Sequence, residues 1–516
     1  MSYNNIYNFK NPIRHFINID WLNYPSNISS LDIEDTCWTQ PIKFRIQKDA
    51  HGFRTLKLPN ILQTVCAYEN FKNFPDFSNP QNLDIDHKRL SPVMETGDFK
   101  IGAYDEQLEN DFNNLCIYDN LLRLDIKEFY GRIYTHYLDF NGLNDRYITN
   151  MNMGATNGLI MGNYLSLYFA EQHLSKISKR GCEEINNANI SCEFSYFSDD
   201  FYFFCNKHDN DVLINIFDKV LEEFDLERNT DKIAFWDYST YNQENLMTRY
   251  WKKINYYCNT HFFSDSDKNK LVFINQLIYR SSSFKTEKQK RVFINNFFKS
   301  KYFRTLDVSK FEFRDYDYHQ LCFLFRTSPE ALLYSIDVLQ NISNFNKSNI
   351  KKFFEILYFE ALNNPCHDVQ LYYYYALNIL EFTDIILNYG NQVLKSENQI
   401  LISYYIENDL FDTTQLDLLK QITDEQYWFQ NYHLILHRSD LYANIDQSIE
   451  TYLVPKKTLP NPTDTPTTIT IRKTYTDFYK NNLSNRLSIL NTITEVEQEI
   501  HNYLDLRFAE EMHLYS

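Results

Sequence analysis

Residues 194–204 read Phe-Ser-Tyr-Phe-Ser-Asp-Asp-Phe-Tyr-Phe-Phe, so aromatic residues flank a Ser198-Asp199-Asp200 turn on both sides. Aromatic residues favour strands, and Ser and Asp favour turns, which predicts a β-hairpin with two carboxylates at its tip. Upstream, Leu121–Ile126 predicts a buried strand that ends in a third acid, Asp125. Carboxylates at neighbouring strand ends can bind two divalent cations, although an Asp pair in a turn is also common without any metal.

A second β-hairpin is predicted closer to the N-terminus. Phe44–Lys48 and Arg54–Leu58 alternate apolar with polar residues around an Asp49–Gly52 turn. The basic residues of this hairpin are Lys43, Arg45, Lys48, Arg54 and Lys57. Two interpretations are open: a basic patch that binds phosphates, or an edge hairpin whose lysines protect it against aggregation.

Helical periodicity dominates the rest of the chain. Asn163–Lys176 and Asp211–Phe224 predict helices on either side of the aromatic hairpin. Beyond about residue 245 the helical period is nearly continuous, and Ser328-Pro329 predicts a helix start with Ser at the N-cap. The further predicted helices are Lys270–Tyr279, Glu287–Phe298, Ala331–Leu339, Ile350–Leu362, Leu371–Leu387, Gln399–Ile406 and Gln415–Ile422, and Thr476–Met512 predicts one or two long helices. Such helices suggest stacked pairs of the HEAT-like type.

Composition bounds the possible functions. The 516 residues carry 51 basic and 68 acidic side chains, a net charge of −17, so nucleic-acid binding has to be confined to a local basic site. Of the ten glycines, only Gly390 follows Gly181, which puts the turn-rich region early in the chain. No apolar stretch is long enough for a membrane helix, and the N-terminus lacks a signal peptide pattern. Nine scattered cysteines predict reduced thiols and a cytoplasmic location.

Five segments resemble, in the family's order, conserved motifs of reverse transcriptases. They are Lys48–Pro59 (fingers), Asp125–His136 (motif A), Gly158–Leu167 (motif B), Phe197–Asp200 (motif C, the YxDD box) and Leu226–Lys232 (motif D). The resemblance covers about residues 40–240 and implies a polymerase that adds nucleotides by two-metal chemistry. By this resemblance Asp125, Asp199 and Asp200 are the catalytic residues and the ligands of two Mg²⁺ ions, with Mn²⁺ as an alternative.

The resemblance also implies the nucleotide-binding residues. Lys48 and Arg54 would hold the triphosphate, and Tyr130 would lie under the sugar and exclude a 2′-hydroxyl, so that dNTPs are the substrates. Gly158 and Gly162 would let the backbone of motif B approach the primer strand or nucleotide. Lys232 is similar to the motif D lysine, which can protonate pyrophosphate.

The sequence differs from the usual reverse-transcriptase pattern in three features. Ile160 and Met161 stand where motif B usually has Pro and Gln, Phe197 replaces the Tyr of the YxDD box, and no thumb is recognisable after motif D. A thumbless core followed by helical repeats resembles the abortive-infection reverse transcriptases of bacteria, of the AbiK type, and most of all their shorter prophage-encoded relatives. The loss of the Gln argues against ordinary templated synthesis.

The expected fold is therefore α+β, with fingers and palm but no thumb, followed by an all-α HEAT-like domain. The expected boundaries are 1–245 for fingers and palm, 246–454 for the repeats, 455–470 for a Pro/Thr-rich linker and 471–516 for C-terminal helices.

The family resemblance implies phage defence by template-independent DNA synthesis, in which the DNA stays covalently attached to the protein. It further implies a homo-oligomer, a trimer or hexamer, while the phage-derived trigger is unknown. Tyr3 and Tyr7 are candidate priming tyrosines, because they lie in a polar N-terminal segment that could reach the site. Two alternatives stay open: an RNA-templated reverse transcriptase, and a catalytically silent polymerase fold that serves as a scaffold.

Overall fold

The computed structural model describes residues 2–7, 13–31, 35–49, 52–100, 102–245, 272–304, 311–458 and 461–514. The chain forms two compact units. Unit 1 comprises residues 1–42, 57–244 and 444–487, and unit 2 comprises residues 43–56, 245–443 and 488–516. Both units are therefore discontinuous in sequence, whereas the expected domains were consecutive segments. Residues 246–271 of the expected repeat domain lie outside the described residues.

Unit 1 is built on a four-stranded antiparallel sheet with the order β4-β5-β3-β6. The strands are β3 (Asn120–Asp125), β4 (Glu193–Phe197), β5 (Asp200–Cys205) and β6 (Ala234–Trp236). The predicted strand and the predicted aromatic hairpin are thus confirmed, and the two become neighbours because β3 pairs with β5.

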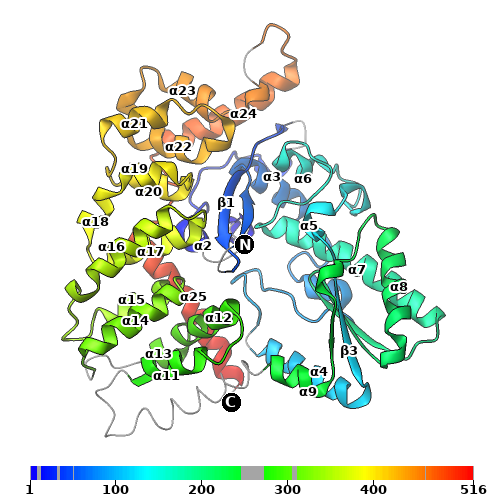
Figure 1. Ribbon diagram of the computed structural model, residues 1–516. Coiled ribbons are helices and arrows are strands. Elements are labelled where there is room, and N and C mark those ends of the chain that lie inside the picture. The colour runs from blue at the N-terminus through cyan, green and yellow to red at the C-terminus, as the bar shows by residue number, and fades with distance from the viewer. Residues whose placement is uncertain are drawn as a thin grey trace. The chain divides into compact units, whose positions relative to one another are not determined.

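Helices cover both faces of this sheet (Figure 1). Alternate residues of a strand point to opposite faces. On one face, Leu122, Leu124 and Phe203 belong to the main core with α7 (Tyr164–Asn187) and α8 (Asn210–Glu222). On the other face, Leu121 and Phe204 form a smaller cluster with α4 (Ala103–Ile117) and α9 (Tyr238–Glu244). The sheet is consequently fixed from both sides, which positions the ends of its strands.

The remaining elements of unit 1 are short, apart from α3 and α24. They are α1 (Tyr3–Tyr7), α2 (Ile13–Phe16), η1 (Ile28–Ser30), α3 (Ile61–Phe71), η3 (Pro80–Asp84), α5 (Phe129–Arg132), η4 (Thr135–Tyr137), α6 (Arg146–Thr149), η5 (Asn150–Asn152), η6 (Lys207–Asp209), η7 (Thr230–Lys232), α23 (Ile445–Tyr452), η11 (Lys456–Thr458) and α24 (Pro466–Ser484).

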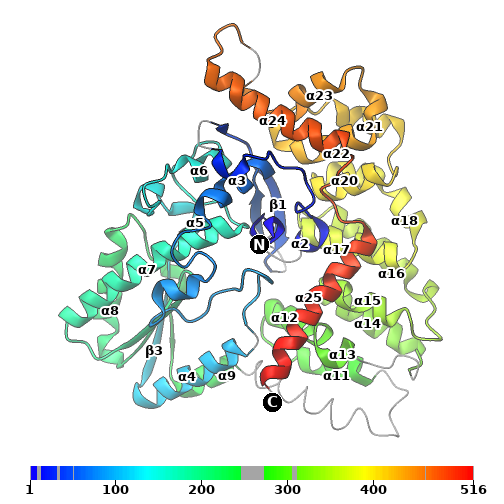
Figure 2. The same cartoon turned by 180° about the vertical axis from the view of Figure 1, so that it is seen from behind.

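Unit 2 contains most of the predicted basic hairpin, which is formed by β1 (Ile42–Gln47) and β2 (Phe53–Leu58); Ile42, Lys57 and Leu58 belong to unit 1. The other regular elements described for unit 2 are helical. Its helices are α11 (Val272–Ser281), α12 (Glu287–Phe298), α13 (Lys301–Arg304), α14 (Asp315–Thr327), α15 (Ala331–Leu339), α16 (Ser348–Leu362), α17 (His367–Ile379), α18 (Thr383–Asn388), α19 (Gly390–Lys395), α20 (Gln399–Glu407), α21 (Thr413–Lys420), η9 (Glu425–Tyr427), α22 (Trp428–His437), η10 (Ser439–Leu441) and α25 (Ile493–Leu514). The views from front and back both show α25 running past α12 and α15 (Figures 1 and 2).

Three local expectations differ from the structure. The single helix expected at Leu371–Leu387 is broken between α17 and α18, because Glu381 adopts a left-handed backbone (φ 57°) that ends the first helix. Ser328 does not cap α15: the N-cap residue is Glu330, without a side-chain cap, and the Ser328 hydroxyl donates to Asn295. The expected linker at 455–470 is interrupted, because α24 begins at Pro466 with the Thr465 side chain as its N-cap.

Two findings concern membrane and redox expectations. No helix within the described ranges is long and apolar enough to cross a membrane. The eight cysteines among the described residues are all free thiols.

A buried histidine beneath the sheet makes unit 1 sensitive to acid. His173 of α7 packs against the rings of Phe129 and Phe224, and burial, with a smaller contribution from Lys176, lowers its pKa to about 4. The folded protein therefore binds this proton less readily than the unfolded chain, so stability present above pH 6.5 is lost as pH falls toward 4.

We expect the free energy of unfolding to fall by about 1.4 kcal/mol for this group between about pH 7 and about pH 5.5. This change in the free energy of unfolding is measured by urea denaturation of the wild-type protein and of His173→Phe at both pH values. The variant should show the smaller pH dependence, and an unchanged dependence would refute the assignment.

Candidate functional site

The predicted catalytic acids lie together at one end of the sheet in unit 1. Asp125 and Asp200 are directly opposite each other in the β3–β5 register, and the backbone N–H of Ile126 donates to the carbonyl of Asp199 at 3.0 Å. Ser198, at the tip of the β4–β5 hairpin, has φ 53°. This left-handed conformation is costly for a residue other than glycine, and such strain is found where tertiary contacts fix a turn for a function.

The backbone of motif D pairs with the chain at the end of β3, next to Asp125. Ile126 forms an antiparallel bridge with Arg228, and the backbone N–H of Asn229 donates to the carbonyl of Asp125 at 2.7 Å. As a result, the Asn229 amide donates to Oδ1 of Asp125 at 2.9 Å, and the Lys232 ammonium donates to Oδ2 at 2.7 Å. The predicted motif D lysine thus contacts the predicted motif A acid directly.

The three carboxylates differ in their electrostatic surroundings. Burial, reinforced by the charge of Asp125, raises the pKa of Asp199. Burial also raises the pKa of Asp200 to about 6, although the Arg123 guanidinium 3.7 Å away opposes the rise. Charges of like sign held in a half-buried site repel one another unless a cation neutralises them.

These acids suit a hard divalent cation by their chemistry. Carboxylate oxygens at a strand end and a neighbouring turn are the ligands that Mg²⁺ prefers, together with water and phosphate oxygens. In this structure Lys232 supplies the positive charge at Asp125. The only group of three or more His, Cys, Asp or Glu side chains in the described part of the chain whose ligand atoms all lie within 4.8 Å is a different one, in unit 2.

Motifs A and B meet through two glycines. The N–H of Gly158 donates to the carbonyl of Ile133 at 2.9 Å, and the N–H of Leu159 donates to that of Tyr130 at 2.7 Å. Gly158 has φ 91°, and a Cβ there would lie 3.0 Å from the carbonyl oxygen of Gly131. The close approach made possible by Gly158 is therefore to the backbone of motif A, while its predicted contact with primer or nucleotide stays a prediction.

Replacing Gly158 by Ala is expected to destabilise unit 1 by about 1–3 kcal/mol, because the side chain adds strain at positive φ and collides with Gly131. Gly142→Ala is the matched control, since Gly142 has φ 84° but nothing within 4 Å of its Cβ position. Urea denaturation should show the larger loss for Gly158→Ala. Equal losses would mean that the contact with motif A contributes nothing.

Tyr130 and Gly162 are the remaining predicted nucleotide-binding residues of motifs A and B. Tyr130 is the second residue of α5, next to Phe129, with the ring centroids 5.8 Å apart, and is half-buried against the main core. Gly162 has φ 122°, a backbone conformation open to glycine, directly before the Asn163 N-cap of α7. Their predicted roles toward the nucleotide stay predictions.

The two residues that are predicted to bind the triphosphate belong to unit 2. Lys48 and Arg54 are exposed on the β1–β2 hairpin. The hairpin is held by Arg291, whose guanidinium donates to the carbonyl of Lys48 at 2.6 Å, and by Asp368, which accepts the N–H of Gln47 at 3.1 Å. Lys48 also lines a cavity of about 190 Å³ with Arg291 and Asp368. Their contact with a nucleotide stays a prediction.

The N-terminal tyrosines are more enclosed than their sequence suggests. Tyr7 is fully buried, and its hydroxyl donates to the carbonyl of Pro59 at 2.8 Å; burial raises its pKa well above the usual value. The Tyr3 hydroxyl donates to Glu69 at 3.1 Å, and burial together with that carboxylate raises its pKa to about 12. Priming by Tyr7 would require its side chain to leave this buried position, because a nucleophilic hydroxyl has to be accessible.

Sequence analysis missed Asn229, which holds Asp125 through both its backbone and its side chain. The motif D pattern contained this residue, and its position three before Lys232 was the available signal. It also missed Arg123, which lies between Asp200 and the ring of Trp236. A buried ion pair of Lys88 and Glu171, 2.7 Å apart, left no recognisable pattern because the two residues are distant in sequence.

No protein-family model matches the sequence, and no curated protein matches it. Among solved structures, apo telomerase from Candida tropicalis is similar with a TM-score of 0.28 and 12% identity, over 70% of this chain and 67% of that one. Telomerase from Candida albicans, in complex with a TWJ fragment of telomeric RNA, is similar with the same TM-score and identity, over 81% of this chain and 66% of that one. At these low scores the similarity carries no inference about activity.

Proposed function

We propose that this chain is a reverse-transcriptase-like DNA polymerase that adds dNTPs by two-metal nucleotidyl transfer. The observation that carries the proposal is the contact of Lys232 and Asn229 with Asp125, beside the Asp199-Asp200 turn. Motifs A, C and D were identified separately along the sequence, and unrelated segments have no reason to meet at one strand end.

Asp125 and Asp199 would hold the Mg²⁺ ions, with Asp200 close by. Bound there, Mg²⁺ would activate the attacking hydroxyl and neutralise the charge that develops on the leaving pyrophosphate. Asn229 orients the Asp125 carboxylate through Oδ1. With a cation at Asp125, the Lys232 ammonium would no longer be needed at Oδ2 and could donate a proton to the pyrophosphate.

The finer proposal is template-independent, protein-primed synthesis in phage defence. It rests on the resemblance to the abortive-infection reverse transcriptases, on the residues found in place of the motif B Pro and Gln, and on the net charge of −17, which disfavours a free primer. A tethered strand reaches an effective concentration on the order of millimolar without new contacts. The homo-oligomer and the cytoplasmic location belong to the same proposal.

The deciding experiment incubates purified protein with Mg²⁺ and dNTPs only. A protein–DNA species that resists hot detergent supports protein-primed synthesis, and mass spectrometry of the digested product then identifies the tyrosine that carries the nucleotide. Synthesis that depends on an added RNA template and primer would support a conventional reverse transcriptase. No incorporation under either condition would support a silent scaffold.

Sugar selection tests Tyr130 independently of priming. We expect Tyr130→Ala to raise the use of ribonucleotides relative to dNTPs at least about tenfold, because a smaller side chain leaves room for the 2′-hydroxyl. The measurement is the ratio of rNTP to dNTP incorporation in the two proteins. Tyr134→Ala is the control, since Tyr134 is an exposed tyrosine of the same segment. If the ratio of rNTP to dNTP incorporation is unchanged in Tyr130→Ala, Tyr130 has no role in sugar selection and serves only in packing.

A further inference from the structure

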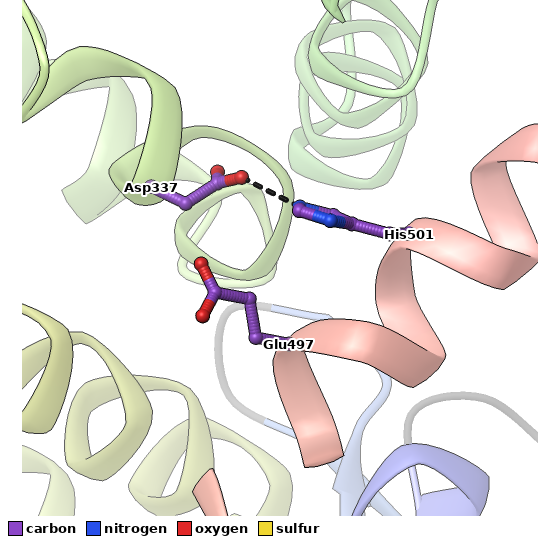
Figure 3. A group of neighbouring side chains, drawn as sticks. All are labelled: Asp337, Glu497 and His501. Atoms are coloured by element: carbon purple, nitrogen blue, oxygen red, sulfur yellow. Dashed lines mark hydrogen bonds and ion pairs between the residues drawn. The ribbon is translucent and has the colours of Figure 1, made fainter. Parts of the chain in front are cut away.

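Three side chains of types that bind metal ions gather in unit 2, on α15 and α25. Asp337 of α15 is buried, and Glu497 and His501 lie one turn apart on α25, half-buried. Figure 3 shows the three side chains pointing toward one another. Nε2 of His501 is 2.9 Å from Oδ2 of Asp337, and one ligand atom from each residue lies within 4.8 Å of the other two.

The charges of this cluster are incompletely balanced. Arg304 of α13 contacts both oxygens of Asp337 at 2.9 Å and so neutralises that carboxylate. Glu497 brings a second carboxylate to the same place and makes no hydrogen bond or ion pair within the described residues. Two carboxylates held this close with one arginine favour a further cation between them.

An independent observation concerns Tyr375 of α17. Its side chain is fully buried, and its hydroxyl has no hydrogen-bond partner among the described residues. After burial, the charges of Asp337 and Glu497 contribute most to raising the pKa of this hydroxyl. Buried hydroxyls without a partner are rare in folded proteins and commonly mark a missing water or ion.

We propose that Asp337, Glu497 and His501 bind one divalent transition-metal ion, Zn²⁺, which fastens α25 to α15. One imidazole nitrogen and two carboxylate oxygens form a ligand set that suits Zn²⁺ and leaves a fourth position for water. On binding, the proton on Nε2 of His501 passes to solvent, and its lone pair goes to the ion. Ligand atoms of a tetrahedral Zn²⁺ lie about 3.4 Å apart, so the ion draws Glu497 inward by side-chain rotation.

Arg304 is compatible with this site. A carboxylate offers about four lone-pair positions, and Arg304 uses one on each oxygen of Asp337. An arginine in this position orients the carboxylate, as outer hydrogen-bond partners of metal ligands generally do. The competing arrangement is a protonated His501 that bridges the two carboxylates without any metal.

The test uses the full-length protein with Asp125→Asn and Asp199→Asn, which removes two of the three predicted Mg²⁺ ligands. After treatment with a chelator, Zn²⁺ is titrated by calorimetry, and Co²⁺ is added separately to record its visible absorption. We expect one Zn²⁺ per chain and a Co²⁺ spectrum typical of tetrahedral coordination. Glu497→Gln and His501→Ala should each weaken Zn²⁺ binding at least about tenfold.

Glu499→Gln on the same helix is the matched control and should bind Zn²⁺ as the unsubstituted protein does. Circular dichroism of each variant establishes that it is folded. Absence of Zn²⁺ binding, or equal binding by the Glu497, His501 and Glu499 variants, would overturn the proposal. A raised His501 pKa with no Zn²⁺ binding would overturn it in favour of the protonated bridge.

Discussion

Asp199→Asn is expected to reduce nucleotide incorporation at least about a thousandfold while the fold is retained. The substitution removes one negative charge and one predicted metal ligand from the turn beside Asp125, and metal ions contribute several kcal/mol to the stabilisation of such a transition state. Each 1.4 kcal/mol corresponds to a factor of ten in rate. Incorporation of labelled dNTP in the presence of Mg²⁺ is the measurement.

Asp225→Asn is the matched control for this loss. Asp225 is an acid of the same unit with φ 56°, a backbone conformation that Asn also adopts. Its carboxylate accepts a hydrogen bond from the Tyr137 hydroxyl, and the side-chain oxygen of Asn can accept the same hydrogen bond. This variant should retain near wild-type incorporation. Near wild-type activity of Asp199→Asn would instead refute the assignment of the metal site.

Lys88→Met is expected to destabilise unit 1 by about 3–5 kcal/mol. The Lys88 side chain is fully buried, with its ammonium 2.7 Å from Glu171 and 2.9 Å from the carbonyl of Pro80. Burial lowers the pKa of Lys88 and raises that of Glu171, so each charge depends on the other. Removing one partner leaves an uncompensated buried charge, which is the costly case.

The double variant Lys88→Met/Glu171→Met should recover most of this loss, because apolar side chains of similar size commonly replace a buried pair at little cost. Lys480→Met is the control, since Lys480 pairs with Asp446 at the surface and should lose at most about 1 kcal/mol. The free energy of unfolding of the wild type, the two single variants and the double variant is measured by urea denaturation. A loss for Lys88→Met no larger than that for Lys480→Met would contradict the prediction.

The backbone next to Lys88 is hydrogen-bonded to the strand that precedes the Asp199-Asp200 turn. Arg89 donates its N–H to the carbonyl of Tyr196, and Tyr196 donates its N–H to the carbonyl of His87, both at 2.8 Å. The backbone around Lys88 therefore supports β4, the strand that leads into the Asp199-Asp200 turn. We expect single variants of the pair to lower incorporation together with stability, and the double variant to restore both.

Local elements were predictable where neighbours within a few residues set the conformation. The apolar run at 121–126 and the aromatic residues of 194–204 predicted β3, β4 and β5, and the helical period predicted α12 and α15 to the residue. The prediction failed at Glu381, where a left-handed residue other than glycine ends a helix. It also failed at Ser328, whose hydroxyl donates to Asn295, a partner distant in sequence.

The sequence by itself determined the strand–turn elements that carry Asp125 and Asp199, the helical character of the second half, and the motif order, because periodicity and turn chemistry are properties of short segments. Only the tertiary structure decided that Asn229 and Lys232 contact Asp125, and that His501 meets Asp337. It likewise grouped residues 43–56 with the helices of unit 2 and residues 444–487 with unit 1. Such pairings join segments far apart in the chain, and they depend on which apolar faces are buried together, which no local pattern specifies.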